Sequence, residues 1–268
     1  MVNDILKDRN ERIGGFVAAP APEEYAKRYS GHLLMQRDGG ILEVRLHTSG
    51  EPAVYSRGML NGWGQALSDI GRDPENEVLI LTGTGSHWIA KVDPRSFAQP
   101  LSAWPADELY EQYLDGVRLL ERLVFDIQIP TIAAINGPGP RLEMALLCDI
   151  TLCSEDVVIA DGNFMAGSVP GDGMFLVLRE LLGSKRAAHI VYTGEQLDAR
   201  SALELGVVSE LLPREQLIPR AREIAERIMT KPRTSRRLTH AVIQRQWQQR
   251  IVDELRSSYA QQLLASSR

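Results

Sequence analysis

Residues 130–150 read PTIAAINGPGPRLEMALLCDI, and this segment indicates the class of fold. The short apolar run 131–135 is bounded by Pro130 and by the turn signal Asn136-Gly137-Pro138, which is typical of a strand buried on both faces. The following stretch, Glu143 to Cys148, predicts a buried helix with Asp149 as its cap. A strand, a turn and a helix in immediate succession predict a unit of an α/β fold.

The segments that precede this unit repeat the pattern. Val78 to Thr82 (VLILT) is another wholly apolar strand, and Gly83-Thr84-Gly85 ends it. Apolar residues at helical spacing predict helices over 57–70 and 106–125. Residues 33–46 alternate around Asp38-Gly39-Gly40, which predicts a hairpin. Apolar strands that alternate with helices predict an α/β fold with both sheet faces covered.

The remaining segments divide the chain into three parts. Strands are expected over 150–152, 157–160 and 207–212, and Gly183 is expected to end a helix over 174–182. Residues 1–22 are predicted to form an arm outside the fold, and residues 23–213 are predicted to form the core.

Residues 214–268 carry too few apolar positions to form a domain alone. We therefore expect this C-terminal helical region to pack on the core or on a neighbouring subunit.

Composition excludes several classes of function. The formal net charge is −5, which gives no electrostatic basis for binding nucleic acid or an anionic membrane surface. No apolar run approaches the ~20 residues that cross a bilayer, and the first residues lack the apolar core of a signal peptide. The two cysteines, Cys148 and Cys153, match no zinc spacing, so we expect reduced thiols, a cytoplasmic protein and no metal.

Several motifs in order resemble the crotonase (enoyl-CoA hydratase/isomerase) superfamily. The two turns after residues 78–82 and 131–135 resemble those that build the crotonase active site, and 143–150 resembles the helix that follows. Later matches are the segments 168–173 (SVPGDG) and 193–211. The resemblance covers about residues 23–268 and implies a ββα-superhelix core with a C-terminal helical trimerisation region. It also implies a homotrimer or a dimer of trimers.

Within this superfamily, the chain most resembles the 6-oxocamphor hydrolase type of β-diketone hydrolase. The stretches 37–40 (RDGG), 169–173 (VPGDG), 197–200 (LDAR) and 219–223 (PRARE) carry this likeness. It implies hydrolysis of a C–C bond between two carbonyls of a cyclic β-diketone, by a retro-Claisen reaction that uses no cofactor. Lys91 stands where CoA-binding members have a small glycine, which argues against a bound pantetheine arm.

The resemblance implies an oxyanion hole of two backbone N–H groups, which stabilise negative charge in the transition state. The first donor falls on Val92. The usual position of the second falls on Pro140, which has no N–H, so Gly139 is expected to replace it.

The same resemblance places proton carriers in the site. Asp172 matches the aspartate of the camphor enzyme, although the same residue could instead cap the helix that follows it. Glu143 matches the first carboxylate of a hydratase. Asn163 occupies the place of the second carboxylate, and an amide cannot accept a proton. We expect Asp172, with Glu143 or His87, to deprotonate water, and Asn163 to hold a carbonyl or water.

Other candidates have alternatives. His87 is either a base at the pocket mouth or an exposed loop histidine. Arg141 either binds a substrate carboxylate or carbonyl or forms a surface ion pair. Trp88 and Phe164 suit either an apolar pocket or the core. The camphor enzyme's two histidines and C-terminal glutamate fall on Arg141 or its neighbour, on Asn163 and on Gln262.

Two rival functions follow from these replacements. One is an enoyl-CoA hydratase or isomerase that acts on an acyl-CoA thioester with rearranged carboxylates. The other is a non-catalytic homologue that keeps the shell of the fold.

Overall fold

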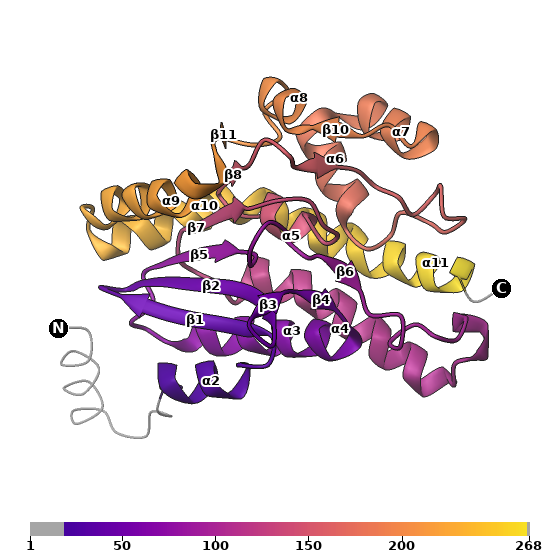
Figure 1. Cartoon of the computed structure of the whole chain (residues 1–268), viewed down its shortest axis with the longest axis horizontal. Coiled ribbons are helices and arrows are strands. Elements are labelled where there is room, and N and C mark those ends of the chain that lie inside the picture. Colours follow the sequence, from indigo (N-terminus) through magenta and orange to yellow (C-terminus); the bar gives the residue numbers. More distant parts are fainter. Residues whose placement is uncertain (1–18, 267–268) are drawn as a thin grey trace.

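The computed structural model describes residues 19–266 and contains a seven-stranded sheet with helices on both faces (Figure 1). The strands are β1 (Leu33–Asp38), β2 (Ile41–Thr48), β3 (Glu51–Pro52), β4 (Val54–Tyr55), β5 (Val78–Thr82), β6 (Lys91–Val92), β7 (Thr131–Ile135), β8 (Ile150–Cys153), β9 (Val158–Ile159), β10 (Leu197–Asp198) and β11 (Glu210–Leu211). The order in the sheet is β1-β2-β5-β7-β8-β11, with β3 on β2. The pairs from β2 to β11 are parallel, and β1 and β3 are antiparallel to β2.

The helices cover the sheet and extend beyond it. They are α2 (Pro22–Arg28), α3 (Arg57–Arg72), α4 (Ala106–Phe125), α5 (Glu143–Leu146), α6 (Met174–Leu182), α7 (Ser184–Thr193), α8 (Ala199–Glu204), α9 (Arg214–Met229), α10 (Arg233–Arg250) and α11 (Arg256–Ser266). A 3-10 helix, η1 (Leu101–Ala103), precedes α4, and a π-helical turn, η2 (Ile251–Leu255), joins α10 to α11.

Alternate side chains of the buried strands belong to two different cores. In β5, Leu79 and Leu81 join the large cluster that includes α3 and α4, whereas Val78 and Ile80 face the smaller cluster completed by α9. This period of two explains why the strand is apolar at every position. The predicted hairpin, the helices over 57–70, 106–125 and 174–182, and both apolar strands are confirmed.

The helix predicted after the second turn is shorter than expected, and Asp149, its predicted cap, bonds to Thr131 instead. The helix predicted over 143–148 is the single turn α5. Asp149 does not cap it; its Oδ2 accepts hydrogen bonds from the backbone N (2.8 Å) and Oγ1 (3.1 Å) of Thr131. A negative charge is also unfavourable at a helix C-terminus, where the dipole is negative. Asp149 therefore fastens the start of β7 rather than the end of the helix.

The C-terminal helices pack on this chain's own core. Helix α9 contacts β5, β7 and β8, and α10 and α11 contact α4. His240 of α10 is buried, with Nδ1 2.7 Å from Oδ2 of Asp149 and Nε2 3.0 Å from the carbonyl oxygen of Ile127. Figure 1 shows α10 and α11 as one helical run across the molecule, with α11 at the C-terminal end, where it contacts α4 and η1.

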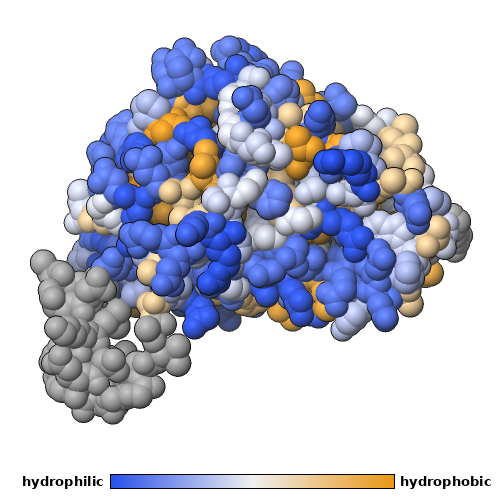
Figure 2. All heavy atoms as spheres, turned by 60° about the horizontal axis from the view of Figure 1, so that its bottom comes forward, coloured by the Kyte–Doolittle hydropathy of each residue, from blue (hydrophilic) through white to orange (hydrophobic). Residues whose placement is uncertain are grey.

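The structure describes only part of the predicted N-terminal arm, and its helices can be compared with the length of a membrane span. Of the predicted arm, residues 1–18 lie outside the described part of the chain, and α2 begins at Pro22. Within residues 19–266, no helix combines the length and apolar character needed to span a bilayer. Figure 2 shows that the face carrying α2, α3 and α4 is mainly hydrophilic, with apolar atoms in separate patches.

Candidate active site

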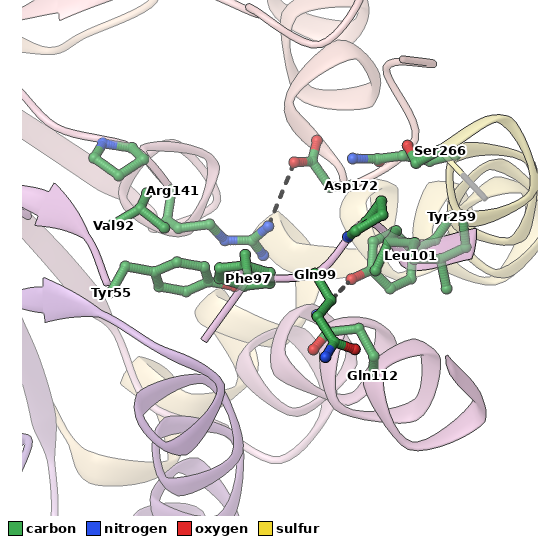
Figure 3. A pocket seen from close by; sticks show the side chains of 14 residues that line it. Tyr55, Val92, Phe97, Gln99, Leu101, Gln112, Arg141, Asp172, Tyr259 and Ser266 are labelled. Atoms are coloured by element: carbon green, nitrogen blue, oxygen red, sulfur yellow. Dashed lines mark hydrogen bonds and ion pairs between the residues drawn. The ribbon is translucent and has the colours of Figure 1, made fainter. Parts of the chain in front are cut away.

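A cavity of about 370 Å³ opens between the two turns, η1 and α11 (Figure 3). Its lining comes from segments far apart in the sequence: Tyr55, Val92, Phe97, Gln99, Pro100, Leu101, Gln112, Pro140, Arg141, Asp172, Tyr259, Gln262, Leu263 and Ser266. Polar side chains from six different segments thus meet beside apolar ones, as in small-molecule sites.

The two turns are joined by Asn136. Its Oδ1 accepts from the backbone N of Gly83 at 3.0 Å, and its Nδ2 donates to the carbonyl of Gly85 at 2.8 Å. The backbones approach so closely that a Cβ at Gly137 would lie 1.9 Å from the carbonyl oxygen of Ser86. Glycine is therefore required there, and the two turns form one rigid wall of the cavity.

Arg141 lies at the centre of the polar side. Its backbone has φ 65°, and its carbonyl accepts a hydrogen bond from Nε1 of Trp88 at 3.2 Å. Its guanidinium lies over the Tyr55 ring, 5.9 Å from the centroid. Nη1 is 3.6 Å from Oδ2 of Asp172. The side chain is only 8% exposed, and Nη2 has no hydrogen-bond partner among residues 19–266. Arg141 thus brings a buried cation to the cavity wall, and the buried Nη2 of this cation has no hydrogen-bond partner in this part of the chain.

Glu143, the first residue of α5, is coupled to this cation. Its Oε1 lies 2.8 Å from Nε of Arg141. Burial raises the pKa of Glu143 to about 7; the Arg141 charge opposes this shift, and the Asp172 carboxylate adds to it. Glu143 is not among the residues that line the cavity, although Arg141 is. Glu143 therefore contacts Arg141 rather than the cavity itself, whereas the sequence analysis expected it to act directly on water.

Asp172 lines the cavity, and two amides fix its position. Nδ2 of Asn163 donates to Oδ1 of Asp172 at 3.1 Å and to Oδ1 of Asp161 at 3.0 Å. Oδ1 of Asn163 accepts from Nε2 of Gln262 at 3.1 Å. Both N–H groups of the Asn163 amide are therefore bonded to carboxylates, so this amide orients Asp172. The sequence analysis had expected it to hold a substrate carbonyl or water.

The alternative role of Asp172 as a helix cap is not observed. The N-cap of α6 is Gly173, with φ 112°, and no side chain makes a capping bond there. A Cβ at Gly173 would lie 2.3 Å from a methyl carbon of Leu120, so glycine is needed for the turn to pass over α4. The Asp172 carboxylate is left to face the cavity.

Three predicted residues lie elsewhere. His87 does not line the cavity, and its Nδ1 is 3.1 Å from Oγ of Ser86 on the exposed turn. Trp88 is fully buried against Trp63, so it supports Arg141 from the core. Phe164 is 43% exposed and meets Tyr192 edge to face at 5.0 Å. Proximity to the turns in sequence did not show in which direction these side chains point.

The predicted oxyanion donors are only partly brought together. Val92 lines the cavity from β6. Gly139 does not, although the next two residues, Pro140 and Arg141, do. A Cβ at Gly139 would lie 2.4 Å from the carbonyl oxygen of Ile89, which shows that Gly139 packs against the other turn. Arg141 lines the cavity at this point, and Figure 3 shows its guanidinium pointing toward Asp172.

Sequence reasoning missed Tyr55, Gln112 and Tyr259. Tyr55 belongs to β4, Gln112 to α4 and Tyr259 to α11, and no local motif marks any of them. Phe97 stacks on the Tyr55 ring at 6.3 Å and extends the apolar wall. A buried polar residue on the apolar face of a predicted helix, as Gln112 is, was the one available signal.

No metal site is apparent in the described residues. Among them, no group of three or more His, Cys, Asp or Glu side chains is arranged to hold a metal ion. Cys148 and Cys153 are free and buried, and burial raises the pKa of both thiols.

Comparisons with known proteins agree with this geometry. The family model for enoyl-CoA hydratase/isomerase matches residues 36–265. A crotonyl-CoA hydratase of Syntrophomonas wolfei is 31% identical over 66% of this chain and 67% of that protein. A carnitinyl-CoA dehydratase of Salmonella typhimurium is 31% identical over 75% of each chain.

Among solved structures, one similar protein is a β-diketone hydrolase from the cyanobacterium Anabaena sp. PCC 7120, bound to (S)-3-oxocyclohexyl acetic acid. It has a TM-score of 0.86 and 34% identity, over 91% of this chain and 97% of that chain. An enoyl-CoA hydratase/isomerase from Mycobacterium paratuberculosis has a TM-score of 0.81 at 22% identity, over 89% and 94% of the two chains, and shows the fold alone. The predicted crotonase fold with a C-terminal helical region is thus confirmed, and the chain belongs to the enoyl-CoA hydratase/isomerase family, the crotonase superfamily.

Proposed function

We propose that this protein hydrolyses a C–C bond between the two carbonyls of a compact cyclic β-diketone, by a retro-Claisen reaction. The observation that carries the proposal is the buried Arg141 guanidinium, with its unpartnered Nη2, beside Asp172 in the same cavity. Such a cation can bind the enolate and the carboxylate that this reaction produces.

Asp172 is the base in this proposal. Its carboxylate takes a proton from water while the water oxygen bonds to one carbonyl carbon. The tetrahedral oxyanion then collapses and the ring C–C bond breaks. Its electron pair passes to the second carbonyl as an enolate, which Arg141 stabilises. Asp172 returns the proton to the enolate carbon, and the product is a keto acid, which ionises to the carboxylate.

The neighbours of Asp172 support this role. The Asn163 amide, itself held by Gln262, leaves the carboxylate little freedom to turn away. Glu143, whose pKa is raised to about 7, regulates how much of the Arg141 charge remains for the ligand. Similarity to the Anabaena enzyme, a β-diketone hydrolase bound to a keto acid, is consistent with the same class of substrate.

The test is a turnover assay with cyclohexane-1,3-dione and bicyclic 1,3-diones, in which keto acids are detected by mass spectrometry. We expect Asp172→Asn to lose at least ~100-fold in kcat, because the amide cannot accept the proton. Asp107→Asn, at an exposed position in the first turn of α4, is the matched control. Full activity in the Asp172 variant would refute the proposed base.

Acyl-CoA chemistry is the second candidate, supported by the hydratase and dehydratase relatives. Asp172, the carboxylate that lines the cavity, would then move the proton on a thioester substrate as in an isomerase. Acetyl-CoA and crotonyl-CoA should raise the melting temperature in that case, because specific binding stabilises the fold. Stabilisation by diones and none by the CoA compounds favours the hydrolase; no ligand response and no turnover would favour a non-catalytic homologue.

We also propose a homotrimer or a dimer of trimers in the cytoplasm. Exposed apolar side chains on α10 and η2 provide a surface for association, namely Leu238, Val242, Ile243 and Val252. The free, buried thiols suit a reducing compartment. A monomer mass by light scattering would refute the assembly.

A further inference from the structure

Tyr259 brings a phenol into the cavity from the side opposite Arg141 (Figure 3). Tyr259 belongs to α11 and is 7% exposed. Its hydroxyl oxygen accepts a hydrogen bond from Nε2 of Gln112, a buried residue of α4, at 3.1 Å. Both residues line the cavity, so this hydrogen bond lies at its wall.

The direction of this hydrogen bond determines what the phenol can do. Because the amide N–H of Gln112 donates, the phenol oxygen is the acceptor and its own hydrogen remains available. No acceptor for that hydrogen is recorded among residues 19–266, and the cavity is the space that both side chains line. Burial raises the pKa of Tyr259, so the phenol keeps its proton at neutral pH.

The fold makes room for the Tyr259 ring. A Cβ at Gly116 of α4 would lie 2.3 Å from Cε1 of the ring, so only glycine allows the ring to pack here. Tyr113 stacks on the same ring at 6.2 Å. The phenol is therefore held by packing, as a preorganised donor has to be.

We propose that the Tyr259 hydroxyl is a hydrogen-bond donor to a substrate oxygen, and that it acts as the second donor beside the Arg141 guanidinium. It compensates for Pro140, which lines the cavity and has no N–H to donate. Two donors that enter from opposite sides suit two carbonyl oxygens of one compact molecule. The inference rests on the proposed function for the identity of that molecule, but the hydrogen bond requires only a carbonyl.

The first test is Tyr259→Phe, which removes the hydroxyl and keeps the ring between Gly116 and Tyr113. Loss of one oxyanion donor typically lowers kcat by ~100-fold or more, and we expect that loss here with a much smaller change in KM. Tyr110→Phe is the control, because Tyr110 is 59% exposed and does not line the cavity. Equal kcat in the wild type and the Tyr259 variant would overturn the inference.

The second test uses Gln112→Glu, which is nearly isosteric. A carboxylate at this position accepts the phenol hydrogen instead of donating to the oxygen, so the donor is turned away from the cavity. We expect a loss similar to that of Tyr259→Phe, with recovery at low pH once the carboxyl is protonated and can donate. Because Gln112 acts through the hydroxyl, the change should cost nothing further in a Tyr259→Phe background. An additive loss would show that Gln112 has another role and would contradict the inference.

The same variants separate this inference from the proposed function. Binding of cyclohexane-1,3-dione, 3-oxocyclohexyl acetic acid and crotonyl-CoA is measured by calorimetry for wild type and Tyr259→Phe. A lower kcat of the variant on crotonyl-CoA, with no turnover of diones by the wild type, would support Tyr259 while refuting the hydrolase. Turnover of diones unaffected by the variant would support the hydrolase and refute Tyr259. No binding of any of the three compounds by the wild type would count against both.

Discussion

Nε of Arg141 lies 2.8 Å from Oε1 of Glu143, and both side chains are almost fully buried. The pair is therefore held in an environment where an unpaired charge is costly. Its second carboxylate neighbour, Asp172, is 3.6 Å from Nη1 of the same guanidinium. One cation thus balances two carboxylates of the site, and its removal affects both stability and chemistry.

Arg141→Met is expected to destabilise the protein in a pH-dependent way. At pH 8 the variant leaves the Glu143 carboxylate without its cation, and breaking a buried pair costs about 3–5 kcal/mol. At pH 5.5 Glu143 is protonated, since its pKa is about 7 even with Arg141 present, and the cost is smaller. Urea unfolding at the two pH values measures the difference. Equal losses at both would contradict the prediction, and adding Glu143→Gln should restore much of the stability at pH 8.

Glu143→Gln alone is expected to change how stability depends on pH. Burial raises the pKa of Glu143 from its ordinary value of 4.5 to about 7 in the folded state. Below pH 4.5 both states are protonated and the group contributes no pH dependence. Between 4.5 and 7 the unfolded chain loses the proton first, so wild-type stability falls, by on the order of 3 kcal/mol, and then levels off.

The glutamine variant lacks this decline. Its stability relative to wild type should therefore rise between pH 4.5 and pH 8, whatever constant cost the substitution adds. Unfolding free energies measured in urea at several pH values check this. A constant difference between the two proteins across that range would show that Glu143 ionises normally in the fold.

Asn163→Leu is expected to reduce activity through Asp172. Without the amide, the Asp172 carboxylate loses the donor at 3.1 Å that fixes its orientation, and Asp161 loses one as well. We expect kcat to fall ~10- to 100-fold, less than for Asp172→Asn, because the base itself remains. The measurement is dione turnover by both variants. A loss as large as that of Asp172→Asn would give Asn163 a direct part in the chemistry.

His240→Leu is expected to lower the free energy of unfolding by about 3 kcal/mol. It removes the imidazole nitrogen that lies 2.7 Å from Oδ2 of the buried Asp149 carboxylate. Gln244 of α10 keeps its hydrogen bond to Oδ1 of Asp149 at 3.0 Å, so the substitution removes one of two links between α10 and this carboxylate. Urea unfolding provides the value. His189→Leu is the control, since His189 is 62% exposed and its pairing with Glu195 should contribute less than about 1 kcal/mol. Similar effects of the two substitutions would contradict a structural role for His240.

The fold could be predicted largely because its strongest signals are local. The strands at 78–82 and 131–135 are apolar at every position and end at glycine turns, and α4 has a long apolar stripe between polar ends. The one-turn length of α5 was not predictable in this way. The contact of the Asp149 carboxylate with Thr131, eighteen residues earlier, was not predictable either, because it depends on how the strands are arranged.

Residues of the site were predictable only where they lie in a segment that resembles a motif of the family. Asp172, Arg141, Val92 and Gln262, which the family resemblance placed in the site, line the cavity. Tyr259 did not stand out, because its role depends on the space at Gly116, far away in the sequence. His87 and Phe164 were expected at the pocket and do not line the cavity, because a turn gives the position of a residue but not the direction of its side chain.

The packing of α11 against α4 has a consequence for assembly of the site. Tyr259, Gln262, Leu263 and Ser266 form one wall of the cavity, and all of them follow every strand of the sheet in the chain. Every strand of the sheet is therefore synthesised before this wall of the cavity. A chain that ends before α11 lacks four of the residues that line the cavity, so the last segment to be made is the one that completes the site.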